Sequence, residues 1–264
     1  MQPYLRYPGG KSRIAKKIVA KLPPHETYVE PMVGGGSVYF AKERSTKEII
    51  SDIDTSLMNF YRDLKAGKVK RCNMTPNKTK FERIRAKSKK NSSLSSCEYL
   101  YLNKLSYGGK MGTTMDPAAK IKCKGKKAKT CGVASKNHET YSERLNKTRI
   151  ESGDFKKKIS KHDSKDTLFY LDPPYVTKTT DYYRNGEQAP QEMKKTVDKI
   201  KGKFVLSYNN SKQIRDIFCK KYDCEKIKTT YSINKHDLRA PATELIIKNY
   251  RCKLTKGRKI CKKV

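Results

Sequence analysis

Three consecutive glycines, Gly34 to Gly36, stand between a strand-like segment and a helix-like segment near the start of the chain. The preceding residues 27–33 are largely apolar, and residues 38–43 continue with side chains that suit a helix. Glycine adopts backbone conformations that other residues avoid, so the chain can turn sharply here and leave its backbone open to a ligand. The pattern predicts a strand, a tight turn and a helix in immediate succession.

The next segment repeats this alternation. Residues 48–51 form a second short strand pattern that ends at Asp52, and a helical stretch reaches Tyr61 with Asp54 or Thr55 as its cap. Later strand patterns are found at residues 167–171, 203–208 and 243–250. Strands that alternate with helices predict a parallel sheet covered by helices, which is an α/β fold.

The middle of the chain and its end have a different composition. Between about residues 65 and 150 lysine and serine dominate, with a helical stretch at 97–103, so this region resembles a helical insertion. Residues 120–129 hold six lysines and no acid, which is typical of a phosphate-facing loop or of a merely solvated run. Residues 251–264 hold seven basic residues and no acid, and we expect a poorly ordered, electrostatic tail.

The charge balance points to a polyanionic partner. The chain has 61 Lys and Arg against 26 Asp and Glu, a formal net charge of +35 over 264 residues. Self-repulsion of this size is usually tolerated where phosphates neutralise it, which makes nucleic acid the first candidate. Its 17 Tyr and 7 Phe supply a core, so the composition excludes pure disorder.

The cysteines and the apolar runs indicate the compartment. None of the eight cysteines has the CxxC spacing of structural zinc, and the four histidines lie singly, so we predict free thiols and no metal. Free thiols suit a reducing compartment. No run approaches the ~18 apolar residues of a membrane span, and the N-terminus lacks a signal-type stretch. We expect an intracellular, soluble protein without a membrane partner.

The strongest chemical motif is Asp172-Pro173-Pro174-Tyr175, directly after a strand pattern. Two prolines end a strand abruptly, and ligands of open α/β sheets bind at the carboxyl edge where such strands end. The carboxylate of Asp172, the carbonyl of Pro173 and the ring of Tyr175 offer two acceptors and a stacking face to a planar group with an exocyclic amine. The alternative is a structural Pro-Pro turn with an incidental acid and tyrosine.

The glycine turn is the second motif. It lies within Glu30 to Ser37, and Asp52 closes the next strand eighteen positions after Gly34. An acid at this place can accept from ribose hydroxyls. The dinucleotide fingerprint needs glycine at position 39, where Tyr39 stands, so the sequence favours a nucleoside ligand without pyrophosphate over NAD. A tight turn without a ligand is the alternative.

The third motif is Tyr7-Pro8-Gly9-Gly10-Lys11-Ser12, whose Gly-Lys-Ser resembles the end of a phosphate-binding loop. That loop requires a glycine where Leu5 stands and a preceding strand, so ATP hydrolysis by a P-loop enzyme is disfavoured. Taken alone, this segment reads as a basic turn.

Taken together, these motifs resemble a known family. Tyr-Pro-Gly-Gly-Lys, the Glu30 to Ser37 turn, Ser51-Asp52-Ile53-Asp54 and Asp172 to Tyr175 occur in the order found in Dam-like DNA adenine N6-methyltransferases, the D12 class or alpha group. The resemblance implies a Rossmann-like class I methyltransferase sheet with an inserted, mainly helical target-recognition domain. It assigns residues 1–61 and 150–250 to catalysis and S-adenosylmethionine binding, 62–149 to the insertion and 251–264 to a basic tail.

The family also implies a cofactor site. Its residues would be Tyr7, Lys11, Glu30, Pro31, Met32, Gly34, Gly36, Ser37, Asp52, Phe155 and Asp172. The family usually has Trp where Tyr7 stands and an aromatic residue where Met32 stands, departures that keep apolar bulk but weaken stacking.

For DNA, the family suggests side chains from the insertion and from a hairpin near the last strands. The expected contacts are Lys104, Tyr107, Lys124, Lys126, Lys127, Lys235 and Arg239. Tyr107 would be a stacking wedge, or else a core tyrosine near a helix end. The lysines and the arginine would meet phosphate, and Lys235 or Arg239 could also meet a base edge.

The implied reaction moves a methyl group from S-adenosylmethionine to N6 of an adenine flipped out of double-stranded DNA, with Asp172, Pro173 and Tyr175 as catalytic residues and no metal. Alternatives are cytosine N4, adenine in RNA, or a nonenzymatic basic DNA-binding protein. The sequence leaves open the recognition sequence, a restriction–modification partner endonuclease, the host, whether cell or virus-infected cell, and whether the protein is a monomer or a weak dimer on DNA.

Overall fold

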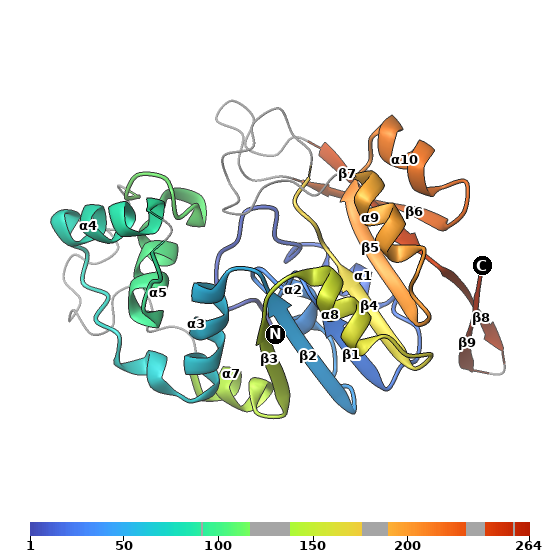
Figure 1. The fold of residues 1–264 in the computed structure, drawn as a ribbon, viewed down its shortest axis with the longest axis horizontal. Coiled ribbons are helices and arrows are strands. Elements are labelled where there is room, and N and C mark those ends of the chain that lie inside the picture. The colour runs from blue at the N-terminus through green and yellow to red at the C-terminus, as the bar shows by residue number, and fades with distance from the viewer. Residues whose placement is uncertain (91, 117–137, 176–189, 231–240, 256) are drawn as a thin grey trace.

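The structure is a computed structural model that describes residues 1–90, 92–116, 138–175, 190–230, 241–255 and 257–264. In this part of the chain, seven strands form one sheet in the order β3-β2-β1-β4-β5-β7-β6, in which β7 alone runs antiparallel to its neighbours (Figure 1). The strands are β1 Thr27–Glu30, β2 Lys47–Asp52, β3 Thr148–Ser152, β4 Thr167–Leu171, β5 Lys203–Asn209, β6 Asp223–Thr230 and β7 Pro241–Lys248. The predicted α/β fold with a mostly parallel sheet is confirmed.

Helices cover both faces of the sheet, because the central strands are apolar on both sides. All five residues of β4 are buried: Leu168 and Tyr170 join one core cluster, and Phe169 and Leu171 join the other. The first cluster includes residues of α1 Ala15–Val19, α2 Ser37–Ala41 and α3 Thr55–Lys65. The second includes residues of α8 Phe155–His162, α9 Pro190–Val197 and α10 Lys212–Phe218.

The region between β2 and β3 is mainly helical where it is described, as expected. After α3, whose predicted cap Asp54 accepts from the Leu57 backbone N–H, come η1 Lys68–Arg71, α4 Lys78–Lys89, α5 Ser96–Leu105, η2 Tyr107–Gly109 and α7 His138–Leu145. Phe60 of α3 stacks on Tyr99 of α5 with ring centroids 6.0 Å apart. The helices α4 and α5 lie to one side of the sheet (Figure 1).

Two strands, β3 and β6, were not predicted because both are edge strands with polar sequences. In β3 the only buried residues are Thr148 and Glu151, and Glu151 is paired with Lys158 and Lys161. A strand that buries a charged residue through ion pairs lacks the apolar alternation by which sequence analysis finds strands.

The C-terminal residues form a hairpin, so the expectation of a poorly ordered tail is wrong. The strands β8 Tyr250–Thr255 and β9 Arg258–Lys263 pair antiparallel, and the Cys252–Cys261 disulfide joins two residues that face each other. The ammonium of Lys259 donates to the carbonyls of Ala20 and Leu22, and that of Lys263 donates to Ile200 and Lys201. The cross-link and these contacts order a segment whose charge alone suggests disorder.

The prediction of free thiols is also wrong for the described cysteines. Besides the hairpin disulfide, Cys72 pairs with Cys97 and Cys219 with Cys224, with Cα atoms 5.2 and 5.6 Å apart. The partners meet through tertiary packing, which cysteine spacing does not reveal. Because disulfides are rare in reducing compartments, the cysteines no longer support one. Cys123 and Cys131 lie outside the described residues.

Among the described residues there is neither a membrane-spanning helix nor a cluster of metal ligands. No helix among them has both the length and the apolar character needed to cross a bilayer. No group of three or more His, Cys, Asp or Glu side chains in the same ranges lies close enough together to hold a metal ion.

Candidate active site

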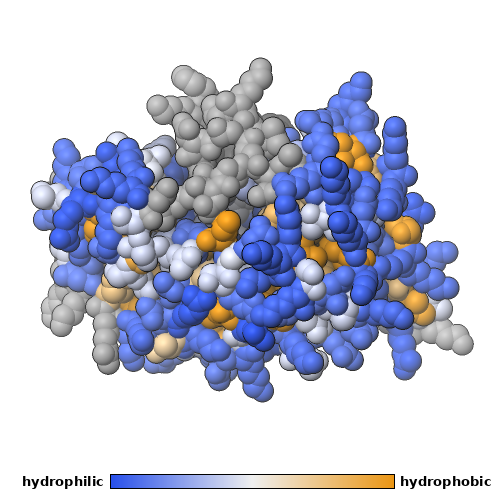
Figure 2. Space-filling model, viewed as in Figure 1, coloured by the Kyte–Doolittle hydropathy of each residue, from blue (hydrophilic) through white to orange (hydrophobic). Residues whose placement is uncertain are grey.

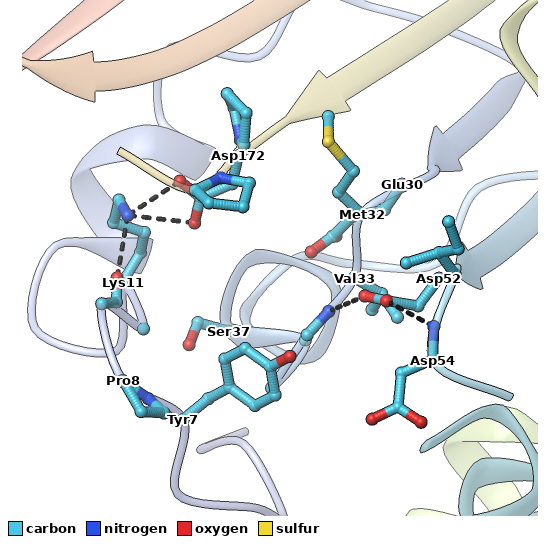
Figure 3. A pocket seen from close by; sticks show the side chains of 18 of the residues that line it. Tyr7, Pro8, Lys11, Glu30, Met32, Val33, Ser37, Asp52, Asp54 and Asp172 are labelled. Carbon is cyan, nitrogen blue, oxygen red and sulfur yellow. Dashed lines mark hydrogen bonds and ion pairs between the residues drawn. The ribbon is translucent and has the colours of Figure 1, made fainter. Parts of the chain in front are cut away.

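A cavity of about 600 Å³ opens at the carboxyl ends of β1, β2 and β4, a size typical of small-molecule sites. It is lined by residues from all the motifs singled out in the sequence, as Figure 3 shows. All the predicted cofactor and catalytic residues line it: Tyr7, Lys11, Glu30, Pro31, Met32, Gly34, Gly36, Ser37, Asp52, Phe155, Asp172, Pro173 and Tyr175. Sequence segments up to 168 residues apart therefore meet in one place.

The glycine turn forms one wall of the cavity, and a larger residue would clash with its neighbours there. Gly34 has φ +45°, and a Cβ on it would lie 2.9 Å from the ring of Tyr7. Gly36 has φ +67° and precedes α2, and a Cβ there would lie 3.1 Å from Phe40. The Tyr61 hydroxyl donates to the Gly34 carbonyl at 2.8 Å, so the turn is held from below. Tyr7, the first residue of the Tyr7–Ser12 motif, packs over the turn.

Asp52 points into the cavity from the end of β2, next to the glycine turn (Figure 3). Its carboxylate accepts from the backbone N–H groups of Gly34 at 3.0 Å and Asp54 at 3.1 Å. Burial raises the pKa of Asp52 to about 6, although both N–H donors oppose this shift. The glycine turn and the start of α3 thus fix the carboxylate, which lines the cavity and keeps further acceptor capacity.

Asp172 is held from two sides. Its carboxylate lies 2.8 Å from the ammonium of Lys11, which also donates to the Gly9 carbonyl at 2.8 Å, and Lys11 is only 5% exposed. From β5, the Ser207 hydroxyl donates to Asp172 at 3.0 Å. The Tyr7–Ser12 motif therefore reaches the Asp-Pro-Pro-Tyr motif through an ion pair across 161 residues of sequence.

Tyr175 is fixed by contacts from three separate segments. Its hydroxyl donates to the carboxylate of Glu244 on β7 at 2.6 Å, and Glu244 is 1% exposed. Its ring lies 5.8 Å from that of Tyr208 on β5, and the Lys11 ammonium stands 4.7 Å from the ring centroid. Lys11 thus lies close to both the carboxylate and the ring that the sequence assigned to the target base.

Sequence analysis missed Glu244 and Ser207 as part of this site. Both stand inside apolar strand patterns, in Thr243-Glu244-Leu245-Ile246 and Val205-Leu206-Ser207-Tyr208. A polar residue that interrupts a buried strand was the available signal, because such a residue needs a partner.

Glu30, at the end of β1, is the most deeply buried acid of the cavity wall. It is 2% exposed, and its carboxylate accepts from the Tyr28 hydroxyl at 2.6 Å. Burial raises the pKa of Glu30 to about 8, and the nearby charge of Asp172 adds to the rise. At neutral pH the acid form of Glu30 therefore dominates.

The insertion is anchored to Arg6, the residue just before the Tyr7–Ser12 motif. The Asn103 side chain on α5 accepts from the Arg6 backbone N–H at 3.0 Å and donates to the Arg6 carbonyl at 2.6 Å. Of the predicted DNA contacts, Lys104 donates to the Tyr4 carbonyl at 2.7 Å, whereas Tyr107 is 54% exposed. The remaining predicted contacts, Lys124, Lys126, Lys127, Lys235 and Arg239, lie outside the described residues.

This sheet, with a glycine turn after its first strand, an acid ending the next and Asp-Pro-Pro-Tyr after β4, defines a Rossmann-like methyltransferase. The family model for D12 class N6 adenine-specific DNA methyltransferases matches residues 7–233, and the chain belongs to this family.

Relatives in distant organisms support this assignment. The type II methyltransferase M.MjaIII of Methanocaldococcus jannaschii is 28% identical, over 95% of this chain and 99% of its own length. The type II methyltransferase M1.LlaDCHI of Lactococcus lactis subsp. cremoris is 25% identical, over 95% and 96%. A DNA adenine methylase of Vibrio cholerae is 25% identical, over 67% and 66%.

The chain is therefore an enzyme, a DNA adenine methyltransferase, and DNA is its substrate. This finding speaks against the alternative of a nonenzymatic DNA-binding protein.

Proposed function

We propose that this enzyme transfers the methyl group of S-adenosylmethionine to N6 of an adenine turned out of double-stranded DNA, within a short specific sequence. One observation carries the proposal: Asp172, Pro173 and Tyr175 line the same cavity as the triple-glycine turn and Asp52. A base-binding motif and a nucleoside-binding turn are thus within reach of each other.

The glycine turn and Asp52 fit the cofactor. The glycines let a ligand approach the backbone, and the fixed carboxylate of Asp52 suits ribose hydroxyls. Asp52 and Asp172 are the acidic groups that suit a cationic ligand, because Glu30 is mainly protonated at neutral pH. When bound, S-adenosylmethionine supplies an electrophilic methyl group on a sulfonium.

Asp172, Pro173 and Tyr175 fit the adenine. The lone pair of N6 is delocalised into the ring, so a catalyst has to localise it on the nitrogen. Asp172 and the Pro173 carbonyl accept the two N6 hydrogens and aim the nitrogen at the methyl group, while Tyr175 stacks on the base. Lys11 holds the Asp172 carboxylate in place, and the incoming amino group shares that carboxylate with it.

An adenine inside a duplex has to leave the stack to reach this cavity, which costs a few kcal/mol. Tyr107 is exposed just after the C-terminal end of α5, and it is the proposed wedge that fills the space left in the base stack by the adenine. Cations of the insertion, with Lys104 as one candidate, neutralise phosphates.

The test is methyl incorporation from labelled S-adenosylmethionine into duplex DNA, into a duplex without adenine and into structured RNA. We expect label only in adenine-containing duplexes, together with saturable cofactor binding in calorimetry. Label in the adenine-free duplex would indicate cytosine N4 as the target, and label in RNA would indicate an RNA enzyme. Direct detection of modified adenines in DNA from expressing cells would give the recognition sequence.

A further inference from the structure

The C-terminal hairpin has two chemically different faces. Residues that pair across β8 and β9 point to the same side, so the register divides the hairpin cleanly. The inner face contains Tyr250, Cys252, Leu254, Lys259, Cys261 and Lys263. The outer face contains Arg251, Lys253, Thr255, Arg258, Ile260 and Lys262, all of them exposed.

The inner face is attached to the body of the protein at its Tyr250 end and through both inner lysines, whereas Leu254 near the turn is 81% exposed. Tyr250 is fully buried, the two cysteines pack against the core, and both inner lysines donate to main-chain carbonyls. Partial burial, together with the nearby charges of Lys248 and Lys21, lowers the pKa of Lys259. The inner cations are thus used structurally, and they fix the direction in which the outer face points.

The outer face presents four cations without an acid of its own. Arg251 and Lys262 stand directly opposite each other, an arrangement of like charges that destabilises a strand pair. Asp223 offsets Arg251 only in part, at 3.4 Å from its Nε. Along each strand, outer residues repeat about every 6.6–6.8 Å. The cations stand at positions 251 and 253 of β8 and at 258 and 262 of β9, so all four point to the same side of the hairpin.

The hairpin lies at the edge of the sheet opposite the cavity. It follows β7, which runs antiparallel to β5 and ends beside the start of β5, where Asn249 bonds to Gly202 and Phe204. The cavity lies at the other ends of the parallel strands. Figure 1 shows β8 and β9 beyond β6 and β7, far from α4 and α5, and the surface drawn in Figure 2 is mostly hydrophilic.

We propose that the outer face of this hairpin is a second DNA-binding surface, which holds the phosphate backbone of a duplex segment other than the one in the cavity. Arginine and lysine on a two-stranded ribbon can follow a sugar–phosphate backbone without reading bases. DNA is the polyanion that the enzyme meets as substrate, and the opposite position of the hairpin keeps both surfaces accessible at once. The surface would hold the enzyme on DNA while the cavity samples another segment.

The experiment measures how many short adenine-free duplexes one chain binds, by sedimentation at low salt, so its outcome does not depend on methyl transfer. The variant carries Arg251→Gln, Lys253→Gln, Arg258→Gln and Lys262→Gln. We expect two duplexes per chain for the native protein and one for the fourfold variant, which loses the weaker binding step. A milder variant, Lys253→Gln with Lys262→Gln, should keep this step with a salt dependence that is shallower by about 2.

The matched control removes the same charge from exposed lysines on other elements, with Lys47→Gln, Lys147→Gln, Lys157→Gln and Lys195→Gln. We expect the control to keep two duplexes, and the hairpin variant to methylate a short duplex at the native rate. An equal loss in the control, or two duplexes on the hairpin variant, would overturn the proposal. Loss of methyl transfer in the hairpin variant would also overturn it. So would a binding defect seen only when phosphatidylserine vesicles replace the duplexes in the same assay.

Discussion

The cavity and the C-terminal hairpin lie at opposite ends of the parallel strands, the carboxyl edge and the amino edge of the sheet, and they differ in charge. At the carboxyl edge, in a chain of net charge +35, three acids from three strands surround one cavity: Glu30, Asp52 and Asp172. At the amino edge, residues 251–264 contain no acid at all. If the hairpin binds a second duplex as proposed, the phosphate contacts made there stay away from the acids that would orient the amino group of the base.

The two ends of β4 give the sharpest test of this division. Asp172→Ala should lower the rate of methyl transfer roughly 10³-fold, because the amino group of the base loses an acceptor that orients it. DNA affinity should stay within about twofold, because phosphate contacts dominate it. The measurements are single-turnover methyl transfer and duplex binding.

The matched control is Asp166→Ala, which removes an exposed carboxylate just before the amino end of the same strand. Only the main chain of Asp166 is used there, as an acceptor for Glu26 and Thr27. We expect native activity. If the activity of Asp172→Ala stays within a few fold of the native activity, Asp172 has no chemical role in methyl transfer.

Glu30 gives the second test, through the pH dependence of stability. Its pKa is raised from 4.5 to about 8 in the folded protein. The folded state therefore keeps a proton that the unfolded chain releases, so this stabilisation is complete below pH 4.5 and lost as pH rises to about 8. We expect the free energy of unfolding to fall by a few kcal/mol over this range from this group.

Glu30→Gln should flatten that fall, since glutamine can still accept from the Tyr28 hydroxyl at any pH. Asp52, with a pKa of about 6, contributes in the same direction but only at lower pH. Urea unfolding across pH 5 to 9 measures the difference. Parallel curves for the native protein and the variant would mean that Glu30 carries no buried proton.

The carboxyl edge was largely predictable from the sequence, for a local reason. A glycine turn, an acid that ends a strand and a proline-terminated strand are each legible within a few residues, and the sheet brings strand ends together automatically. The full predicted cofactor set lines one cavity for this reason.

The amino edge and the outer supports of the site were not predictable, because they depend on pairing between distant residues. Glu244 meets Tyr175 only after β7 inserts antiparallel between β5 and β6. The basic C-terminal sequence suggests disorder, because the pairing of Cys252 with Cys261 that orders it is visible only in the structure.

Opening the hairpin disulfide should affect the amino edge alone. Cys252→Ser with Cys261→Ser removes a cross-link between residues nine apart, worth roughly 2 to 3 kcal/mol to the ordered hairpin by loop entropy. We expect faster hydrogen exchange in β8 and β9 and loss of the second duplex, with methyl transfer kept within about twofold. The control is Cys219→Ser with Cys224→Ser, which opens a disulfide elsewhere. Lost methyl transfer in the hairpin variant alone would show that the two edges are coupled.

Glu244 should have the smallest effect, because it does not line the cavity and reaches the reaction through its hydrogen bond with Tyr175. Glu244→Ala removes the acceptor of the Tyr175 hydroxyl, so the ring is less well fixed against the base. We expect kcat to fall about tenfold, with little change in KM for the duplex. Tyr175→Phe should cost about the same, and the double variant no more than either, because the same hydrogen bond is lost in all three.

The matched control is Glu225→Ala on β6, a carboxylate that does not line the cavity. Additive losses would show that Glu244 acts on the reaction by another route, and an unchanged kcat would leave the ring positioned by Tyr208 and Lys11 alone.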